Sequence, residues 1–297
     1  MRFDLIKELC EWTWNQKWKA KYIFFTTTNG TLVHGEIKEW LRRHKTQFWC
    51  GLSLDGRPET HNRNRSNSFD KIDIDFFKEC WPEQTIKMTI SKEGMETLAD
   101  DIIYLHSLGF DVTGTNFAEG IDWSDEQYLK IAFEQMEKLC VYYIEHPNIK
   151  PSPLINMRIA RCEEEKVFSK WCGCGEHMAV YDTDGKKYPC TFFTPMTFSK
   201  EQLDSLKNID FTNPDNFIDK ECFENCYLEP VCNCCYGANM MMNGRVNKRD
   251  KSKCELIKIR AIFSAALAAH KLQLDHEDNY ENAMTAKAIL KIGELYQ

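Results

Sequence analysis

Nine of the chain's fourteen cysteines lie between Cys172 and Cys254, in two dense groups. The first group reads WCGCGEHMAVYDTDGKKYPC, and the second reads CFENCYLEPVCNCCYGAN. Thiols at this density pair as disulfides, ligate zinc or ligate iron–sulfur clusters. Whichever chemistry applies, cross-links among these side chains constrain how this part of the chain folds.

Disulfides are the least favoured of the three. The amino terminus, MRFDLIKELCEW, carries no apolar signal segment, and no run approaches the ~20 apolar residues of a membrane helix. A chain kept in the reducing cytoplasm holds its cysteines as thiols, so clusters of them indicate metal. We therefore expect a cytoplasmic protein with no membrane partner.

Zinc is a live alternative, because Cys232-x-x-Cys235 has the spacing of a zinc ribbon. Zinc sites, however, usually consist of two well-separated cysteine pairs. At least eight candidate thiolates lie here within residues 172–254, enough for two four-cysteine sites. Iron–sulfur clusters use cysteine-only ligation and tolerate uneven spacing, which favours iron–sulfur over zinc.

The composition is that of a folded, acidic protein. Of 297 residues 43% are hydrophobic, and the net charge of −7 argues against a general nucleic-acid surface. One basic run, residues 243–253, stands apart. Such runs are usually solvated loops, but cations beside a four-thiolate cluster would also offset its negative charge.

Residues 1–146 alternate between strand and helix patterns. The expected strands are residues 22–28, 48–54, 85–91 and 111–117. Helical spacing marks EIKEWLRR and the segment from Leu98 to the capping position at Gly109, and Ser124-x-x-Gln127 is a capping-box signature. This alternation predicts an α/β fold with parallel β/α units, although four strands are too few to close an eight-stranded barrel.

Ligands of parallel β/α folds bind at the carboxyl ends of strands. Here those ends are small and polar, and include Thr28, Asn29, Ser53 and Asp55. Ordinary turn chemistry explains any single one of them, whereas four polar strand ends in series suggest a ligand. By contrast, His61 is expected on a loop or on a polar surface that faces the substrate. Five scattered thiols are expected to be buried and structural: Cys10, Cys50, Cys80, Cys140 and Cys162.

The rest of the chain divides by composition. We expect an incomplete β/α core at 1–146, a linker at 147–171, a cysteine-rich domain at 172–256 and carboxyl-terminal helices at 257–297. Apolar runs are few in the cysteine-rich domain, so metal is expected to substitute for part of its core.

The segments FFTTTNGTL and GLSLDGRPETHNRNR resemble the middle of a radical S-adenosylmethionine (SAM) enzyme. The cysteine region resembles the SPASM domain of peptide and sulfatase maturases. Cys174, ten residues, Gly185, four residues and Cys190 match its first block, and Cys172 also fits as the starting residue. The quartet that follows runs x3, x5, x2, where the family usually has x2, x5, x3.

This resemblance implies two 4Fe–4S clusters with interleaved ligands. One cluster would be held by Cys172, Cys174, Cys190 and Cys235. The other would be held by Cys222, Cys226, Cys232 and Cys254. Cys234 competes with Cys235 for its position.

The sequence departs from the family at the front. The CxxxCxxC loop that generates the radical and the Gly-Gly-Glu-Pro motif are both absent. The four strands would be the third to sixth of a six-stranded partial barrel. Five positions match the SAM pocket, and they bind SAM only if the missing amino-terminal segment is present: Thr28, Asn29, Ser53, Asp55 and Arg65.

Two functions follow from the resemblance. In the first, the chain is the carboxyl-terminal part of a radical SAM/SPASM enzyme that modifies a peptide or protein, and alone cannot cleave SAM. In the second, it is a cluster-bearing electron-transfer or peptide-binding partner without radical chemistry of its own. Either would draw electrons from a donor such as a ferredoxin or flavodoxin.

Overall fold

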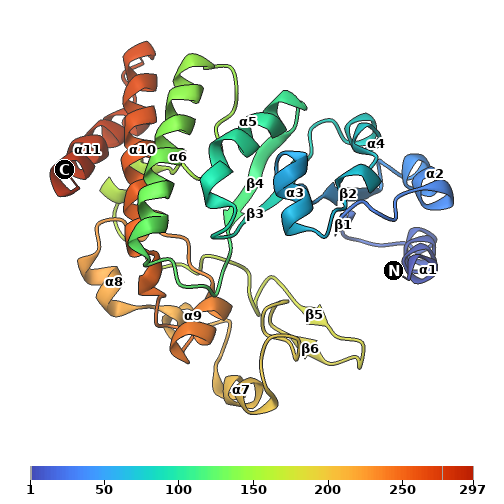
Figure 1. Ribbon diagram of the computed structural model, residues 1–297. Helices are drawn as coiled ribbons and strands as arrows, with labels where there is room; N and C mark the ends of the chain where they lie inside the picture. Colours follow the sequence, from blue (N-terminus) through green and yellow to red (C-terminus); the bar gives the residue numbers. More distant parts are fainter. Residues whose placement is uncertain (1, 276, 297) are drawn as a thin grey trace. The chain divides into compact units, whose positions relative to one another are not determined.

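The computed structural model describes residues 2–275 and 277–296, and the chain forms two compact units (Figure 1). The first unit is Met1–Phe117 with Glu145–Leu154, and the second is Ala118–Ile144 with Ile155–Gln297. Met1, His276 and Gln297 lie outside the described residues. The domain bounds expected from the sequence were drawn from motifs, whereas these two units are defined by their internal contacts. The expected bounds therefore stay predictions.

Parallel strands form the centre of the first unit. They are β1 (Phe24–Thr28), β2 (Phe48–Leu52), β3 (Thr85–Ile90) and β4 (Asp111–Phe117). β1 pairs with β2 and β3 pairs with β4, both in parallel, and an isolated parallel bridge joins Ser53 to Lys87. The expected strands and their parallel pairing are confirmed. The assignment to a partial barrel remains a prediction.

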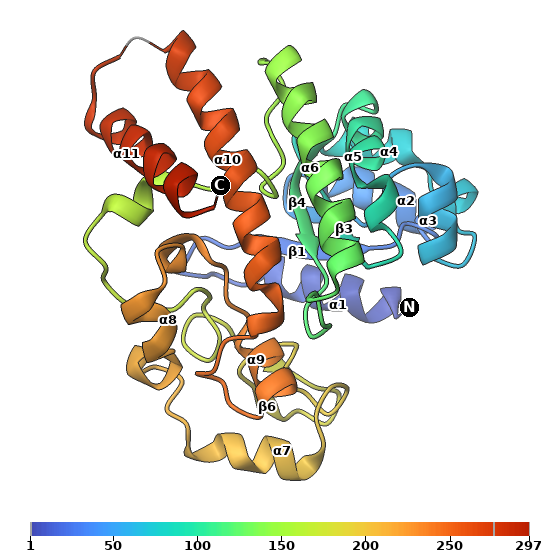
Figure 2. The same cartoon turned by 60° about the vertical axis from the view of Figure 1, so that its left-hand side comes forward.

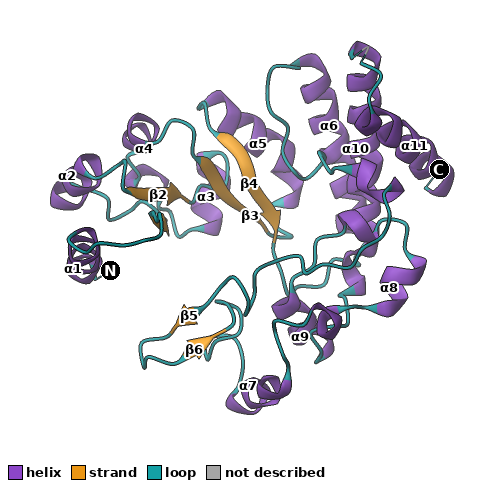
Figure 3. Ribbon diagram, turned by 180° about the vertical axis from the view of Figure 1, so that it is seen from behind, coloured by secondary structure: helices purple, strands orange, loops and turns teal. Residues whose placement is uncertain are grey.

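Helices accompany these strands (Figure 3). They are α1 (Phe3–Trp14), α2 (Gly35–Arg43), α3 (Pro58–Asn64), α4 (Ile74–Cys80) and α5 (Leu98–Ser107). Apolar residues at helical spacing, such as Leu98, Ile102 and Leu105 of α5, are fully buried. The two short helices α3 and α4 were not expected, because neither is long enough to show a repeating apolar stripe.

Two glycines fix the ends of elements in this unit. Gly109 ends α5 at φ +83°, and the Phe110 N–H donates to the Leu105 carbonyl at 3.2 Å. Gly56, at φ +95°, lies after β2, where an added Cβ would stand 2.3 Å from the Cβ of Asp101. Buried Asp101 accepts hydrogen bonds from the Arg57 N–H and the Thr97 hydroxyl, so it cannot easily yield.

We expect Gly56→Ala to destabilise the protein more than Gly109→Ala. Both substitutions strain a left-handed backbone, by about 1–2 kcal/mol. Only the first also displaces Asp101 and its buried hydrogen bonds, which adds about 1–3 kcal/mol. Urea unfolding of the two variants measures the difference, and equal losses of stability would contradict the role given to Asp101.

Helix α4 begins at an ion-paired cap. The Asp73 carboxylate accepts a hydrogen bond from the Phe76 N–H at 3.1 Å and also binds the Lys38 ammonium. The Lys38 hydrogen bond is the largest of the effects that lower the pKa of Asp73 below its usual value. The cap is therefore strongest when Asp73 is ionised.

This depressed pKa gives the cap a defined pH dependence. Because the folded pKa lies below the unfolded one, Asp73 stabilises the fold fully above its unfolded pKa, about 3.9. That contribution disappears as the pH falls through the folded pKa. The melting-temperature difference between wild type and Asp73→Ala should therefore be largest near neutral pH and shrink below about pH 4. A constant difference across this range would rule out the ionic cap.

The second unit is mostly helical. Its elements are α6 (Glu126–Glu145, all but the last residue), β5 (Val180–Tyr181), β6 (Lys187–Tyr188), α7 (Lys200–Ser205), α8 (Lys220–Asn225), α9 (Tyr236–Asn243), α10 (Cys254–Leu274) and α11 (Tyr280–Leu295). No helix in the described ranges is long and apolar enough to cross a membrane.

The expected capping box of α6 is wrong. The helix begins at Glu126, and the Asp125 carboxylate accepts the hydrogen bond from the Gln127 N–H at 2.9 Å. Ser124 lies one residue too early, and its hydroxyl instead donates to Asp122 at 2.7 Å. Ser124 and Asp125 are both common capping residues, so the sequence alone could not decide at which of them the helix begins.

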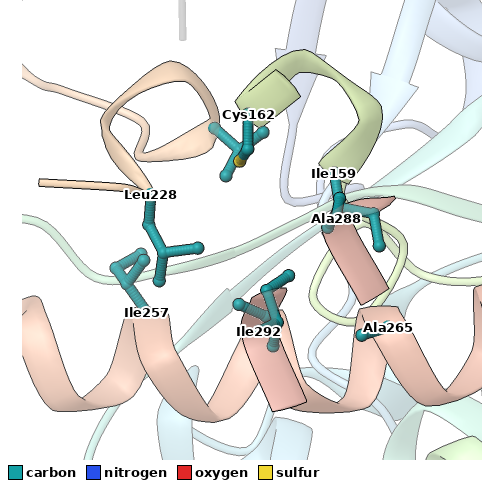
Figure 4. Close-up of a cluster of buried hydrophobic side chains, with 9 residues drawn as sticks. Ile159, Cys162, Leu228, Ile257, Ala265, Ala288 and Ile292 are labelled. Carbon is teal, nitrogen blue, oxygen red and sulfur yellow. The ribbon is translucent and has the colours of Figure 1, made fainter. Parts of the chain in front are cut away.

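Helices α10 and α11 enclose one apolar core of this unit (Figure 4). Alanines on both helices, including Ala265 and Ala288, let their backbones approach, and Ile292 fills the space between them. Cys162 of the 3-10 helix η3 (Ile159–Glu163) packs in the same core. Figure 2 shows α10 and α11 side by side from a second direction.

A second core lies within the cysteine region itself. Cys174 is buried in it among aromatic side chains: Phe193, Phe198, Phe211, Phe217 and Tyr236. Aromatic packing thus fills part of this region, and the expectation that metal substitutes for the rest of its core stays a prediction. These aromatics are spaced irregularly along loops and short helices, so no periodic pattern revealed them.

Candidate functional site

The carboxyl ends of β1 and β2 lie side by side. The Ser53 N–H donates to the Thr28 carbonyl at 2.8 Å, which brings these two predicted site residues together. The Thr28 hydroxyl accepts from the Gly30 N–H at 3.1 Å, and the Asn29 side chain accepts from the Thr31 N–H at 3.3 Å. Each polar group is thus engaged in its own turn.

Asp55 and Arg65 form a part-buried, bidentate ion pair. The guanidinium of Arg65 donates to both carboxylate oxygens, at 2.7 and 2.9 Å, and Asp55 is 3% exposed. Both groups are therefore satisfied within the chain. An external carboxylate reaching Arg65 would have to compete with Asp55 for the same fork.

His61 is fully buried, which corrects its expected place on a loop or a polar surface. Its Nδ1 lies 3.3 Å from the Asp55 backbone nitrogen, and its Nε2 lies 3.1 Å from the Ser68 hydroxyl. Burial lowers the pKa of His61. The ring supports the Asp55 loop from inside, a role that the polar sequence around it concealed.

Three thiols of the first cysteine group are in mutual contact. Hydrogen bonding to Cys174 lowers the pKa of Cys172 and of Cys190 to about 6 each, and the pKa of Cys174 itself is raised. Cys235 lies close enough to Cys190 to interact electrostatically with it. Thiolates are the form that binds metal, so this group is chemically suited to ligation.

The second group gathers around Cys254, at the start of α10. Its thiol interacts electrostatically with those of Cys222, Cys226 and Cys232. Burial is the largest cause that raises the pKa of Cys222, Cys232 and Cys254. Metal binding here must therefore displace protons that the protein alone retains.

Cys234 and Cys235 have different surroundings. The Cys234 sulfur accepts a hydrogen bond from the Asn239 amide at 3.1 Å, and burial raises its pKa to about 12. It interacts with Cys232 and Cys235, whereas Cys235 interacts with Cys190 of the first group. These contacts favour Cys235 over Cys234 as the partner of the first group.

Cations lie against the second group. The Lys251 ammonium donates to the Cys222 sulfur at 3.3 Å. The buried Arg249 donates to the Cys232 carbonyl at 2.8 Å and to Glu229 at 2.5 Å. Lys251 and Arg249 both belong to the basic run of the sequence, so part of that run contacts the thiols rather than forming only a solvated loop.

Residues 164–171 form an irregular segment, here called the strap. Two lysines of the strap donate hydrogen bonds to carbonyls in both cysteine groups. Lys166 donates to the carbonyls of Phe223 and Cys226, at 3.0 and 2.9 Å. Lys170, whose side chain is 4% exposed, donates to the carbonyls of Cys174 and Phe211, at 2.6 and 2.5 Å. Sequence reasoning missed both lysines, because neither belongs to a motif or an apolar stripe.

Asp219 is a further support that the sequence did not reveal. Its carboxylate accepts hydrogen bonds from the Cys222 N–H at 3.3 Å and the Arg249 N–H at 2.8 Å. Burial acts to raise the pKa of Asp219, but these two hydrogen bonds lower it overall. Asp219 thereby joins α8 to the basic run. The sequence did offer one signal for this role, because Asp219 lies three residues before Cys222, the spacing at which an aspartate caps the start of a helix.

The five scattered cysteines are all buried, as expected. Burial raises the pKa of Cys50 and of Cys162 to about 12. Cys162 also interacts electrostatically with Cys226, so one structural thiol adjoins the second group.

No three histidine, cysteine, aspartate or glutamate side chains in residues 2–275 and 277–296 are arranged to hold one metal ion. The donor set of both groups is cysteine sulfur only, and this set fits an iron–sulfur cluster, which takes thiolate ligands.

We expect Lys170→Met to destabilise the protein by about 2–4 kcal/mol, because two buried carbonyls lose their donor. Lys186→Met is the matched control, since Lys186 is an exposed lysine paired with Asp184 and should change stability by less than about 1 kcal/mol. Chemical unfolding of the metal-free proteins measures both. Similar losses in the two variants would show that Lys170 does not hold the strap.

Comparison with known proteins finds relatives by structure alone. No family model and no curated protein matches the chain. A solved structure of a tagged form of anSMEcpe with bound AdoMet matches with a TM-score of 0.65 at 17% identity, over 95% of this chain and 80% of that one. Another, of native anSMEcpe with AdoMet and the Cp18Cys peptide, matches with a TM-score of 0.62 at 18% identity, over 90% and 81%. AnSMEcpe is a radical SAM/SPASM anaerobic sulfatase-maturating enzyme.

Proposed function

Because this chain has a radical SAM/SPASM-like fold, we propose that it belongs to the machinery of a radical SAM enzyme that modifies a peptide or protein. The similar enzyme anSMEcpe has been solved with AdoMet and with peptides, which supports a peptide substrate here. The observation that carries the proposal is the gathering of the cysteines into two groups that interleave along the chain.

In this proposal each cysteine group holds one 4Fe–4S cluster. The first is ligated by Cys172, Cys174, Cys190 and Cys235. The second is ligated by Cys222, Cys226, Cys232 and Cys254. Such clusters supply electron transfer when bound. A ferredoxin or flavodoxin is the corresponding donor.

The chain's own cations fit this assignment. A cluster held by four thiolates carries net negative charge, and burying it requires nearby compensation. Lys251 and Arg249 supply that charge beside the second group. Arg260, which is buried and interacts electrostatically with Cys232, adds a third cation, and burial lowers its pKa to about 10.

For SAM, we propose that Thr28, Asn29, Ser53, Asp55 and Arg65 form a wall of the binding pocket. Arg65 would receive the SAM carboxylate only by exchanging its bond to Asp55. No CxxxCxxC or Gly-Gly-Glu-Pro motif occurs in these 297 residues. We therefore propose that they do not cleave SAM without a segment that carries those motifs.

A second candidate function is also compatible with the two cysteine groups. The chain would then be a cluster-bearing electron-transfer or peptide-binding partner of a separate radical enzyme. A SAM-cleavage assay distinguishes the two: adding a segment with CxxxCxxC in the same polypeptide restores 5′-deoxyadenosine formation in the first case. In the second case, a separate radical enzyme needs this chain for its turnover.

Metal analysis tests the assignment directly. After anaerobic purification and reconstitution, we expect about eight iron and eight sulfide per chain. Cys254→Ala should lose about half of the iron, whereas Cys50→Ala, a buried thiol of the first unit, should keep all of it. Stoichiometric zinc without sulfide would overturn the proposal.

A further inference from the structure

A cavity of about 650 Å³ lies in the second unit, between the β5–β6 hairpin and the segment that contains α7. The hairpin and α7 lie beside each other in all three views (Figures 1, 2 and 3). None of the eight cysteines assigned above lines it. Its volume falls within the range of sites that bind small molecules or parts of peptides, about 300–1,000 Å³.

The walls of this cavity are apolar. Phe193 is fully buried and Phe211 nearly so, and Leu203, Leu206 and Ile209 complete the lining. Aromatic and aliphatic walls favour an apolar group, because its transfer from water is favourable by about 25 cal/mol per Å². An occupant therefore needs at least one bulky apolar side chain.

The rim of the cavity is cationic. Four lysines line it against a single aspartate, Asp204, in a chain whose net charge is −7. Lys186 pairs with Asp184 at 2.6 Å and Lys207 pairs with Asp204 at 2.7 Å. Lys187 and Lys200 form no ion pair with any described residue. They leave two exposed ammonium groups for an anionic occupant.

The cavity wall is tied to the first cysteine group. Pro189 of the lining immediately precedes Cys190. Phe211 packs so closely on Gly175 that an added Cβ would lie 2.4 Å away, and its carbonyl accepts from Lys170. Because Lys170 also bonds the Cys174 carbonyl, an occupant of the cavity is held beside that group.

We propose that this cavity binds a segment of the peptide substrate that carries a bulky apolar side chain flanked by carboxylates. The apolar side chain packs against the partly exposed Leu203 and Ile209 of the cavity wall, and the carboxylates meet Lys187 and Lys200. The residues that line the cavity belong to the second unit, and none of them is among the five proposed for SAM, so the site is an anchor for the peptide that is distinct from the SAM residues. The proposal rests on the proposed function only in taking the occupant to be a peptide.

Fluorescence anisotropy of the full chain tests the site. The probe is a labelled peptide in which a phenylalanine–leucine pair is flanked on each side by two glutamates. We expect it to bind, and binding to weaken at least about tenfold when the apolar pair is replaced by alanines or the glutamates by lysines. No binding of the acidic probe would overturn the proposal.

Charge reversal on the protein gives the decisive comparison. Lys187→Glu with Lys200→Glu should weaken probe binding at least about tenfold. Lys287→Glu with Lys291→Glu, two exposed positions on α11, makes the same change in net charge and should leave binding unchanged. All four positions are exposed, and the melting temperature verifies the fold of each variant. Equal weakening by the two pairs would reduce the effect to net charge and overturn the site.

The outcome is separable from that of the proposed function. Probe binding requires neither clusters nor SAM, so iron content and binding are independent readouts. Failure to bind with about eight iron per chain removes the cavity site and leaves the proposed function standing. Probe binding by a protein that takes up no iron would keep the cavity site and remove the cluster assignment of the proposed function. Binding of laurate in place of the probe would make the cavity a lipid site and overturn the proposal.

Discussion

Main-chain carbonyls bound by buried cations hold the cysteine region in shape. This region has two strands of two residues each and short helices, so few of its carbonyls are paired by regular structure. Lys166, Lys170 and Arg249 each donate to the carbonyl of a cysteine, and so fix the backbone from which the thiols project. The aromatic core around Cys174 then closes over this framework. The placement of these thiols therefore depends on side-chain donors more than on secondary structure.

The β/α half of the chain was readable from sequence because its signals are periodic. Strand patterns and the α5 stripe at Leu98, Ile102 and Leu105 recur at fixed spacing, and Gly109 marked the end of α5. Errors arose where one short-range signal had a close competitor, as with Ser124 and Asp125. His61 was misplaced because its polar neighbours suggested a surface, whereas its ring is enclosed by Asp55 and Ser68.

The sequence of the cysteine region indicated its metal chemistry, but it did not reveal the residues that hold the thiols in place. The density of cysteines indicated metal chemistry, and the family resemblance supplied the grouping that includes the distant Cys254, whose thiol interacts electrostatically with those of Cys222, Cys226 and Cys232. The residues that position them are single side chains on loops, such as Lys170 and Asp219, with no pattern around them. The Asp55–Arg65 pair shows the same limit on the other unit: both residues were expected to face a ligand, and their bond to each other depends on three-dimensional proximity.

The interleaving of the thiols has a consequence for how the protein is made. Cys190 interacts electrostatically with Cys235, and Cys222 with Cys254, so each group joins an early segment to a later one. On a ribosome, which delivers the chain from its amino end, the first group stays incomplete until residue 235 has emerged, and the second until residue 254. Nascent chains therefore expose reactive thiols for several seconds at ordinary elongation rates of about 5–20 residues per second. Any bond that links the two segments of a group can therefore form only after the later segment has been synthesised.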